Sequence, residues 1–542
     1  MNKLLTKTRD FIFAQQTSIF SSTLILAGMI ILSRCAGFIR YRILAGYFTT
    51  PELDVYFAAF RIPDLIFEIL INGALSTTFI PFFIEYQKKQ KEQNSIISSI
   101  INVVCLSLAV FIVVMVIIMP ILVPLITPGF TADKIQEIIW YSRLILIGQL
   151  PFLVVGNFLT GMSQAKKSFL LPAIAPIIYN VAIIVATLMF SEQYHLLAPV
   201  IGVIAGAFLF LVIQLPVLTA IEFRYQLVIK NIIEAKRFFR TAIPRILTII
   251  VAQIDATIDL SLTTFLGAGS YTVFYLAQHL QLLPVSIVGI AFGQASLPYL
   301  SEMYQDKRIK EFKDIIVTSM LNILFLTIPA AAFFIIARTP LVRLFFGGDK
   351  FDWPATVMTA TTLSYFAFSM PLHSIYYFLT RCYYAVFDTR TPFYTSLAAI
   401  GLNAGLSVLF TLVFKLPVWS LAIAFSISMS LHVILLLLLL YKKIKGYDIQ
   451  RFITETIKII IASFNSSVIT YLLMRLLDGL IIDTSRTLNV LILLVIGCIS
   501  FFSLYLFLSW LFGIKELYIL SKMVIKVREY QRRITELYRG VE

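Results

Sequence analysis

Long apolar segments recur along the whole chain and are separated by short polar connections. A helix that crosses a bilayer needs about 20 predominantly apolar residues, and about 14 segments of this chain meet that requirement. The pattern therefore predicts an all-α, polytopic membrane protein, because helices satisfy their own backbone groups in lipid. The expected spans are residues 17–39, 53–84, 97–126, 137–162, 169–190, 197–221, 241–266, 271–299, 315–337, 355–380, 392–414, 418–440, 453–477 and 487–512.

Lysine and arginine alternate between the two sides of these expected spans. The N-terminal segment, every second connection and the C-terminal tail together hold 30 of the 44 basic residues, whereas the intervening connections hold 6 besides Arg40 and Arg42. Cytoplasmic loops of membrane proteins carry the excess of positive charge. We therefore expect a multi-pass protein of the cytoplasmic (inner) membrane with both termini in the cytoplasm.

The composition agrees with this class. Apolar residues make up 59% of the chain and charged residues 13%, against about 25% charged residues in soluble domains. The net charge of +15 follows from the loop pattern, so nucleic acid is not an expected partner. The four cysteines lie far apart, without the spacing of a disulfide framework or a metal site.

The chain repeats part of itself at an offset of 220 residues. Two prolines and a Phe-Leu-Thr tripeptide recur: Pro151, 158–160 and Pro172 return as Pro371, 378–380 and Pro392. A repeat of six spans keeps the same membrane orientation, which is typical of transporters with two lobes and a substrate site between them. The expected organisation is 1–221 as the first lobe (spans 1–6), 222–240 as an interfacial linker helix, 241–441 as the second lobe (spans 7–12), 442–512 as two further spans and 513–542 as a basic cytoplasmic tail.

Charged residues interrupt the first two spans. Arg34 lies in the first and Arg40 directly at its end, and Asp54 and Arg61 lie in the second. A charge at membrane depth is costly and usually faces a bundle interior or a wet cavity, and arginine suits phosphate geometry. These residues predict a site for an anion attached to an apolar molecule. Alternatively, Arg34 extends to the membrane surface, and Asp54 only pairs with one of the arginines.

Two carboxylates share one face of the seventh span. Asp255 and Asp259 are four residues apart, and a buried carboxylate needs a cation, a partner or a proton. Asn403, in the eleventh span, offers an amide oxygen. These three residues are candidates for a sodium site, and the alternative is a protonated or hydrogen-bonded pair.

No catalytic constellation is present in the sequence. There is no phosphate-binding G-x-x-x-x-G-K-[ST] loop, no H-E-x-x-H zinc motif and no nucleophile elbow. We therefore expect a transporter rather than an enzyme, with no cofactor other than a sodium ion. Its energy comes from an ion gradient, the membrane potential or the supply of substrate.

Several motifs resemble one known family. Ser33-Arg34, the Ala-Phe-Arg-Ile-Pro run 59–63, the Gly-Ala-Leu-Ser run 73–76 and the Phe-Leu-Gly-Ala-Gly-Ser run 265–270 resemble the MurJ/MviN family. That family belongs to the multidrug/oligosaccharidyl-lipid/polysaccharide exporter superfamily. The resemblance covers the chain in order and is most specific in the first two spans.

The resemblance implies a flippase for lipid II, the undecaprenyl-pyrophosphate-linked peptidoglycan precursor, that works by alternating access. It implies that Arg34 and Arg40 meet the pyrophosphate and that Asp54 and Arg61 match an acidic and a basic position of the family. It also implies that Asp259 and Asn403 lie at positions similar to those associated with sodium in the family. The expected partners are lipid II and membrane lipids, and we expect the transporter to act as a monomer.

The sequence departs from the family at several cavity positions. The family often has an arginine pair where this chain has Phe67-Glu68, a glutamate where it has Asn72, and an Asp-Arg pair where it has Gln278-His279. His279 supplies a positive charge only when protonated, and it remains a candidate for substrate binding. The alternatives are a flippase for another polyprenyl-linked glycan, a multidrug cation antiporter of the same superfamily, and a membrane scaffold that transports nothing.

Overall fold

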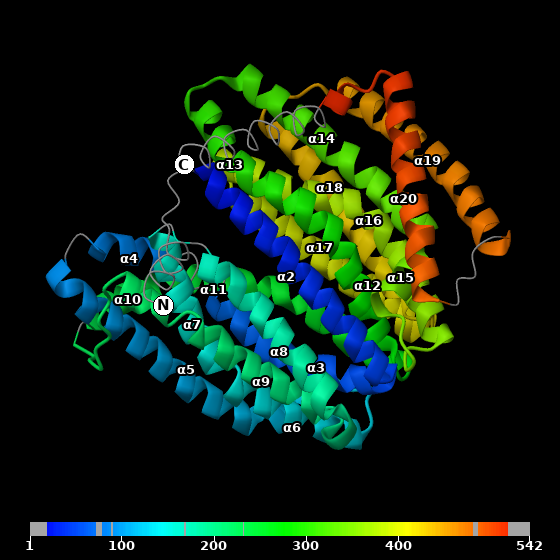
Figure 1. Ribbon diagram of the computed structural model, residues 1–542. Coiled ribbons are helices and arrows are strands. Elements are labelled where there is room, and N and C mark those ends of the chain that lie inside the picture. The colour runs from blue at the N-terminus through cyan, green and yellow to red at the C-terminus, as the bar shows by residue number, and fades with distance from the viewer. Residues whose placement is uncertain are drawn as a thin grey trace, which may run out of the picture. The chain divides into compact units, whose positions relative to one another are not determined.

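A computed structural model describes residues 19–71, 78–87, 90–166, 168, 170–230, 232–480 and 486–518 (Figure 1). The described residues are helical apart from short connections and one isolated bridge between Gly348 and Phe351. The 73–76 motif, Asn72 and most of the basic tail, 519–542, lie outside the described residues. Contacts divide the chain into two compact units, Met1–Thr272 with Phe345–Ala355, and Val273–Leu344 with Thr356–Glu542.

The first unit is a bundle of helices in which α8 packs most extensively against α9, α2 against α8, and α3 against α6. Its elements are α2 (Ile19–Tyr47), α3 (Thr50–Glu68), α4 (Ile80–Gln87), α5 (Gln90–Ile126), α6 (Ala132–Gly148), α7 (Leu150–Ala165), α8 (Leu170–Tyr194), α9 (Leu197–Val212), α10 (Pro216–Ala220), α11 (Ile232–Thr263) and the 3-10 turn η2 (Thr264–Leu266). Helix α12 (Ser270–Pro284) begins in this unit and continues into the second.

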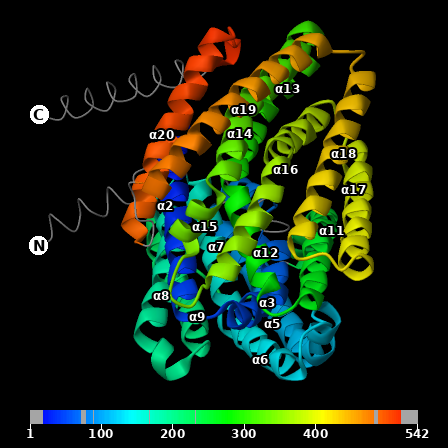
Figure 2. The ribbon, with the colours of Figure 1, turned by 90° about the vertical axis from the view of Figure 1, so that its right-hand side faces the viewer.

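The second unit is also helical, and its closest pairs are α17 with α18, α19 with α20, and α14 with α19 (Figure 2). Its further elements are the π-helix η3 (Val285–Ile290), α13 (Ala291–Gln305), α14 (Ile309–Ile336), α15 (Arg338–Phe346), α16 (Trp353–Ala385), α17 (Arg390–Val408), the π-helix η4 (Leu409–Val413), α18 (Trp419–Lys443), α19 (Ile449–Leu480), α20 (Thr487–Leu511) and η5 (Lys515–Leu517).

The predicted class, an all-helical polytopic membrane protein, is confirmed. Every expected span coincides with helical residues, and ten helical segments among the described residues are long and apolar enough to cross a membrane. The other four expected spans lie on α2, on α3 with α4, on α11 and on α16. The exact number of 14 therefore stays a prediction.

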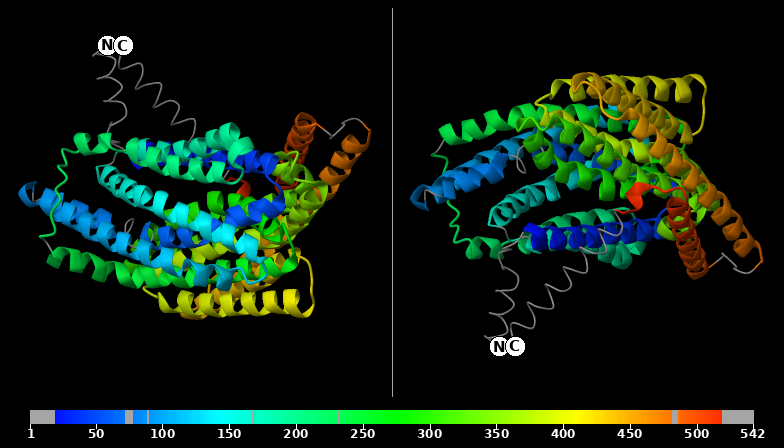
Figure 3. Two further views of the ribbon diagram at one scale, coloured as in Figure 1. Left: turned by 90° about the horizontal axis from the view of Figure 1, so that it is seen from below. Right: turned by 90° about the horizontal axis from the view of Figure 1, so that it is seen from above.

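The segment expected as one linker helix over 222–240 has a different structure. Residues 223–230 are not helical, because their backbone groups bond to polar side chains of α5. Asn102 Nδ2 donates to the carbonyl oxygens of Gln226 and Val228 at 2.9 and 3.0 Å, and the Gln226 N–H donates to Ser98 Oγ. Residues 232–240 form the start of α11, which packs along α5 in the first unit (Figure 3).

The two sequence repeats share a local irregularity. In the first unit π-helical residues follow α3, at 69–71 and 78–79, and in the second unit the π-helix η3 separates α12 from α13. Close packing accompanies the second of these, since a Cβ on Gly289 would lie 2.5 Å from Ser374 Cα of α16. π-helical turns are frequent at functional sites, and they mark corresponding positions in the two repeats.

Prolines inside the helices free backbone carbonyl oxygens, and three of these receive a donor from another helix. Proline has no N–H, so the carbonyl four residues earlier loses its helical partner. Pro63 frees Ala59 O, which accepts from Ser142 Oγ at 2.9 Å. Pro120 frees Val116 O, which accepts from Arg143 Nε at 3.1 Å.

The third case joins α14 and α20 in the second unit. Pro329 frees Phe325 O, and the buried Tyr505 hydroxyl donates to it at 2.9 Å. The two aromatic rings also pack together, with centroids 5.3 Å apart. Each of these three prolines is thus matched by a polar side chain on a neighbouring helix, and the hydrogen bond fixes the relative axial position of the two helices.

The third pair gives a testable prediction. Tyr505→Phe should lower the free energy of unfolding by about 1–3 kcal/mol, because it leaves the buried Phe325 oxygen without a donor. Adding Pro329→Ala should recover part of the loss, since the new alanine N–H can bond to the same oxygen. Thermal unfolding of the purified protein in detergent measures both variants. Tyr471→Phe, on an exposed part of α19, is the matched control, and equal stability of Tyr505→Phe and the parent would contradict the assignment.

Candidate substrate-binding site

Helix α3 is placed by signals in its own sequence. Thr49 precedes its first turn, Pro51 lies at the start of the helix, and Glu52 Oε2 accepts from both the N–H and the hydroxyl of Thr49 at 2.7 Å. This is a capping arrangement that satisfies backbone donors at a helix start. It fixes the first turn of the helix that carries Asp54 and Arg61.

Arg34 and Arg40 both belong to the continuous helix α2. Six residues of helix separate them by about 9 Å along the axis and by about 120° around it. Arg34 is exposed and Arg40 is half-buried, and the Arg40 guanidinium lies 4.7 Å from the centre of the Tyr41 ring. A cation over an aromatic face is stabilised without losing its charge.

Arg61 joins α3 to α11. Its Nε donates to Thr257 Oγ1 at 3.1 Å, and its Nη2 donates to Thr257 Oγ1 at 2.9 Å and to the main-chain and side-chain oxygens of Gln253 at 2.6 and 3.1 Å. All four bonds reach uncharged oxygen atoms. They hold the half-buried guanidinium in place, and none of the acceptors is a carboxylate.

Asp54 has a structural task in the same unit. Its carboxylate is fully buried and accepts from Gly269 N at 2.5 Å and from the N–H and hydroxyl of Thr272 at 2.8 Å each. A carboxylate is favourable at a helix N-terminus, where free N–H groups point outward. Asp54 thus caps the first turn of α12 from another helix. Its hydrogen bonds are made with this turn and not with the neighbouring arginines.

Gly269 allows this cap because of its conformation and its size. Its φ is +87°, a region that favours glycine. A Cβ there would also lie 2.6 Å from Thr50 Oγ1. The 265–270 motif quoted from the sequence therefore includes the turn that receives Asp54.

The three candidate sodium ligands are distributed over both units. Asp255 and Asp259 lie on α11 in the first unit, and Asn403 lies on α17 in the second. Asp259 and Asn403 are 3% and 2% exposed, which is unusual for such polar residues. Among the described residues, no group of three or more His, Cys, Asp or Glu could hold a metal ion. A sodium site would therefore need oxygen ligands of other types, such as Asn403.

Helix α11 has two polar stripes. Gln253 and Thr257 face Arg61 of α3, and Asp255 and Asp259 follow each of them by two residues. Two residues correspond to about 200° of helical rotation. The carboxylates therefore project away from the side of α11 that holds Arg61.

His279 lies on α12 in the second unit. Its Nδ1 is 2.8 Å from the carbonyl oxygen of Tyr275, and its ring lies 4.0 Å from the Tyr275 ring. Because a carbonyl oxygen only accepts, the neutral imidazole carries its proton on Nδ1 and keeps Nε2 as an acceptor. Nε2 becomes a donor to an anion only when the ring is protonated.

Sequence reasoning missed the partners of Arg61 and Asp54. Gln253, Thr257 and Thr272 were not among the candidates, although Gln253 and Thr257 have the same four-residue spacing as the aspartates. The contacts join residues 192 to 218 positions apart, so local patterns could not pair them. The signal that was available is a second polar stripe on an otherwise apolar helix.

These features define a helical membrane transporter with arginines built into its first two spans. The family model for the lipid II flippase MurJ matches residues 44–491. The chain therefore belongs to the MurJ family of lipid II flippases, whose members are transporters rather than enzymes. This confirms the family expected from the sequence.

Relatives and solved structures agree with this assignment. The chain is 25% identical over 389 residues to the lipid II flippase MurJ of Burkholderia cenocepacia, which covers 69% of this chain and 75% of the relative. It is 26% identical over 502 residues to the probable lipid II flippase MurJ of Buchnera aphidicola subsp. Acyrthosiphon pisum, which covers 90% and 96%.

The fold is similar to two solved transporters. A structure of the lipid II flippase MurJ in an inward closed conformation matches with a TM-score of 0.73 at 24% identity and covers 90% of this chain and 98% of the other. An inward-facing multidrug resistance MATE family transporter of the MOP superfamily matches with a TM-score of 0.66 at 11% identity and covers 78% and 98%.

The Asp54 cap gives a second prediction. Asp54→Asn should lower the free energy of unfolding by about 1–3 kcal/mol, since the amide loses the charge and one of the two acceptor oxygens for three buried donors. Thermal unfolding in detergent provides the measurement. Asp133→Asn makes the same change at an exposed position of α6 and should have little effect. If both variants unfold at the same temperature as the parent protein, the structural role of Asp54 is contradicted.

Proposed function

We propose that this chain carries lipid II across the cytoplasmic membrane and that arginines of its first unit hold the pyrophosphate during transfer. Family membership supports the substrate class. The observation that carries the residue assignment is the environment of Arg61. Its guanidinium is fixed by four bonds to uncharged oxygens, so an anion can bind it without displacing a hydrogen-bonded carboxylate.

A pyrophosphate in a bilayer needs charged donors, because the apolar surroundings offer no other compensation. Charge-assisted hydrogen bonds are roughly twice as strong as neutral ones. Arg40 and Arg61 are both half-buried, which reduces screening by water. Arg34 is exposed, and we assign it to the first capture of the headgroup. Asp54 contributes by positioning the start of α12.

His279 marks a difference from the usual family pattern. It adds positive charge only when protonated, so this transporter relies more on its arginines than relatives with an arginine at this position. A flippase for another polyprenyl-linked glycan remains the second candidate, because Gln278-His279 departs from the family motif. The same arginines would bind either substrate, since the pyrophosphate is common to both.

The arginine assignment gives a third prediction. Arg40→Ala and Arg61→Ala should each abolish lipid II translocation, and Arg40→Lys and Arg61→Lys should only weaken it, because lysine keeps the charge but loses the planar fork. The measurement is rescue of growth and of lipid II translocation in bacteria depleted of their own flippase. Arg486→Ala, at an exposed position before α20, serves as the control.

Membrane insertion of each variant is measured in parallel by immunoblotting of membrane fractions. If both alanine variants insert normally and restore full translocation, the pyrophosphate does not depend on these arginines. If the parent itself fails to restore lipid II translocation but restores export of another glycan, the second candidate function replaces the first.

We also propose that a sodium ion binds to Asp255, Asp259 and Asn403. Carboxylate and amide oxygens are hard ligands of the kind that alkali and alkaline-earth cations prefer. The side of α11 that bears the aspartates is not used by Arg61. Asp259 and Asn403 are both buried, and a bound cation would lower the cost of burying the Asp259 charge.

Sodium binding gives a fourth prediction. Sodium chloride should raise the unfolding temperature of the purified protein more than potassium chloride at equal ionic strength, since a ligand stabilises the folded state that binds it. Asp259→Asn should remove this difference. Asp349→Asn, at an exposed position, should preserve it. The site is wrong if the parent responds equally to both salts or if Asp259→Asn responds as the parent does.

The protein is a multi-pass protein of the bacterial inner membrane, as its family and its apolar helices indicate. For its orientation, we infer that both termini are cytoplasmic. The support is the concentration of 30 of the 44 basic residues in the termini and in every second connection. We also infer that a single copy transports, because both repeats lie in one chain.

A further inference from the structure

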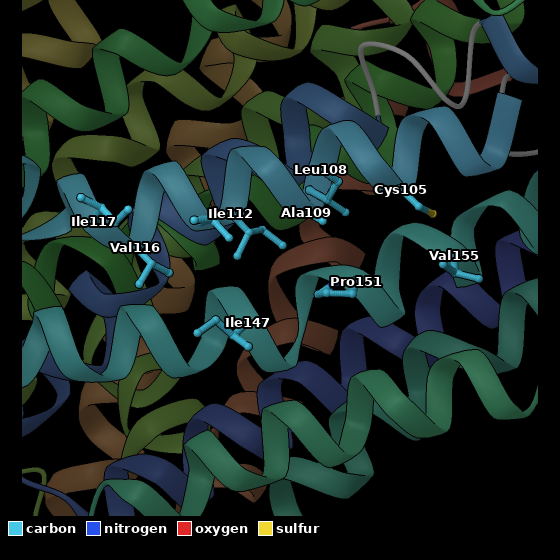
Figure 4. A pocket seen from close by; sticks show the side chains of 10 residues that line it. Cys105, Leu108, Ala109, Ile112, Val116, Ile117, Ile147, Pro151 and Val155 are labelled. Atoms are coloured by element: carbon cyan, nitrogen blue, oxygen red, sulfur yellow. The ribbon is translucent and has the colours of Figure 1, made fainter. Parts of the chain in front are cut away.

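An apolar groove lies between α5 and the α6–α7 pair in the first unit (Figure 4). It has a volume of about 560 Å³, and its lining side chains are apolar apart from the thiol of Cys105. On α5 the lining follows one stripe of the helix, from Cys105 through Ala109 and Val113 to Ile117. Val113 and Ile117 are 58% and 69% exposed, so the groove opens on the outer surface of the unit.

The length of the groove matches one leaflet of a bilayer. Twelve residues separate Cys105 from Ile117, which corresponds to about 18 Å along a helix. The hydrocarbon core of a bilayer is about 30 Å thick, so one leaflet contributes about 15 Å. A single extended hydrocarbon chain that enters from one membrane surface would fill the groove along its length.

A positive charge lies at one end of the groove. Ile147 lines the groove from α6, and Arg143 precedes it by one helical turn. Arg143 is half-buried. Its Nε donates to the carbonyl oxygen of Val116, which also lines the groove. This carbonyl lacks its helical donor because Pro120 has no N–H. This bond fixes the guanidinium beside the groove and leaves its charge unneutralised, since the acceptor is an uncharged carbonyl.

An aromatic residue completes the arrangement toward the membrane surface. Trp140 precedes Arg143 by three residues on the same side of α6 and is 56% exposed. Tryptophan is enriched at the membrane–water interface. Side chains on a helix lean toward its N-terminus, which for α6 is the end that carries Trp140. From the surface inward, the order is therefore an interfacial ring, a cation and an apolar groove.

We propose that this groove binds one acyl chain of an anionic membrane phospholipid whose headgroup phosphate meets Arg143. Interface, charge and hydrocarbon occur in the same order in the lipid and in the protein. The site lies on α5, α6 and α7 of the first unit alone, so it is separate from the residues assigned to the transported substrate. Its occupancy would brace α5 against α6 and α7 where these helices leave a gap.

Quenching of tryptophan fluorescence tests the site. Trp353→Phe, Trp419→Phe and Trp510→Phe leave Trp140 as the only tryptophan of the full chain. The protein is reconstituted in vesicles of unlabelled phosphatidylcholine. One series contains increasing fractions of brominated phosphatidylglycerol, and the other contains increasing fractions of brominated phosphatidylcholine. One basic residue near a membrane surface contributes about 1 kcal/mol to binding an anionic lipid, so phosphatidylglycerol should bind about fivefold more tightly next to Trp140.

Four variants separate the charge from the groove. Arg143→Gln should reduce the preference for phosphatidylglycerol to about onefold, and Arg143→Lys should retain it, since the charge is kept. Val113→Phe should fill the groove and reduce quenching by both lipids. Val114→Phe makes the same change at the next residue of α5, which does not line the groove, and should leave quenching unchanged.

Three results would overturn the proposal. The first is equal quenching by both brominated lipids in the Trp140 protein. The second is a preference that persists in Arg143→Gln, or quenching that is the same in Val113→Phe and Val114→Phe. The third is displacement of brominated phosphatidylglycerol by an equal fraction of undecaprenyl phosphate, which would assign the groove to a prenyl chain.

Discussion

The structure depends on satisfying polar groups that have no access to water. In hydrocarbon an unpaired backbone group costs several kcal/mol, yet this chain places prolines within its helices. At Pro63, Pro120 and Pro329 the freed carbonyl accepts from a side chain of another helix. At these three places an interruption of one helix thereby becomes a contact between two helices.

Helix α6 provides hydrogen-bond donors to two of these freed carbonyls. Two successive residues, Ser142 and Arg143, satisfy carbonyls freed by Pro63 on α3 and by Pro120 on α5. Adjacent residues of a helix point about 100° apart, so one turn of α6 reaches two neighbours. The height of α3 in the bundle is therefore fixed near its proline, a few residues from Arg61, and the same turn sets one end of the apolar groove.

The sequence predicted the helical class, the family and the importance of charges in the first two spans. These predictions were possible because apolar runs, and charges within them, can be read from short stretches of sequence. The linker at 222–240 failed for a different reason. Its alternating basic and apolar residues indicate a surface helix, but Asn102 and Ser98 of α5 bond to the backbone of 226–228, which is not helical. Contacts between residues over 120 positions apart decided the outcome, as they did for Arg61 and Asp54.

Asp54 and Arg61 show how two charges seven residues apart on one helix acquire different tasks. About 700° of rotation brings them to nearly the same side of α3, yet their partners differ in kind. Asp54 is fully buried, and its carboxylate accepts hydrogen bonds from N–H and O–H groups at the start of α12. Arg61 is half-buried against oxygens without charge. The acid is therefore committed to the fold, whereas none of the hydrogen bonds of the base reaches a carboxylate. An arginine held in this way serves a transporter of pyrophosphate well, because it binds the anion without first breaking an ion pair.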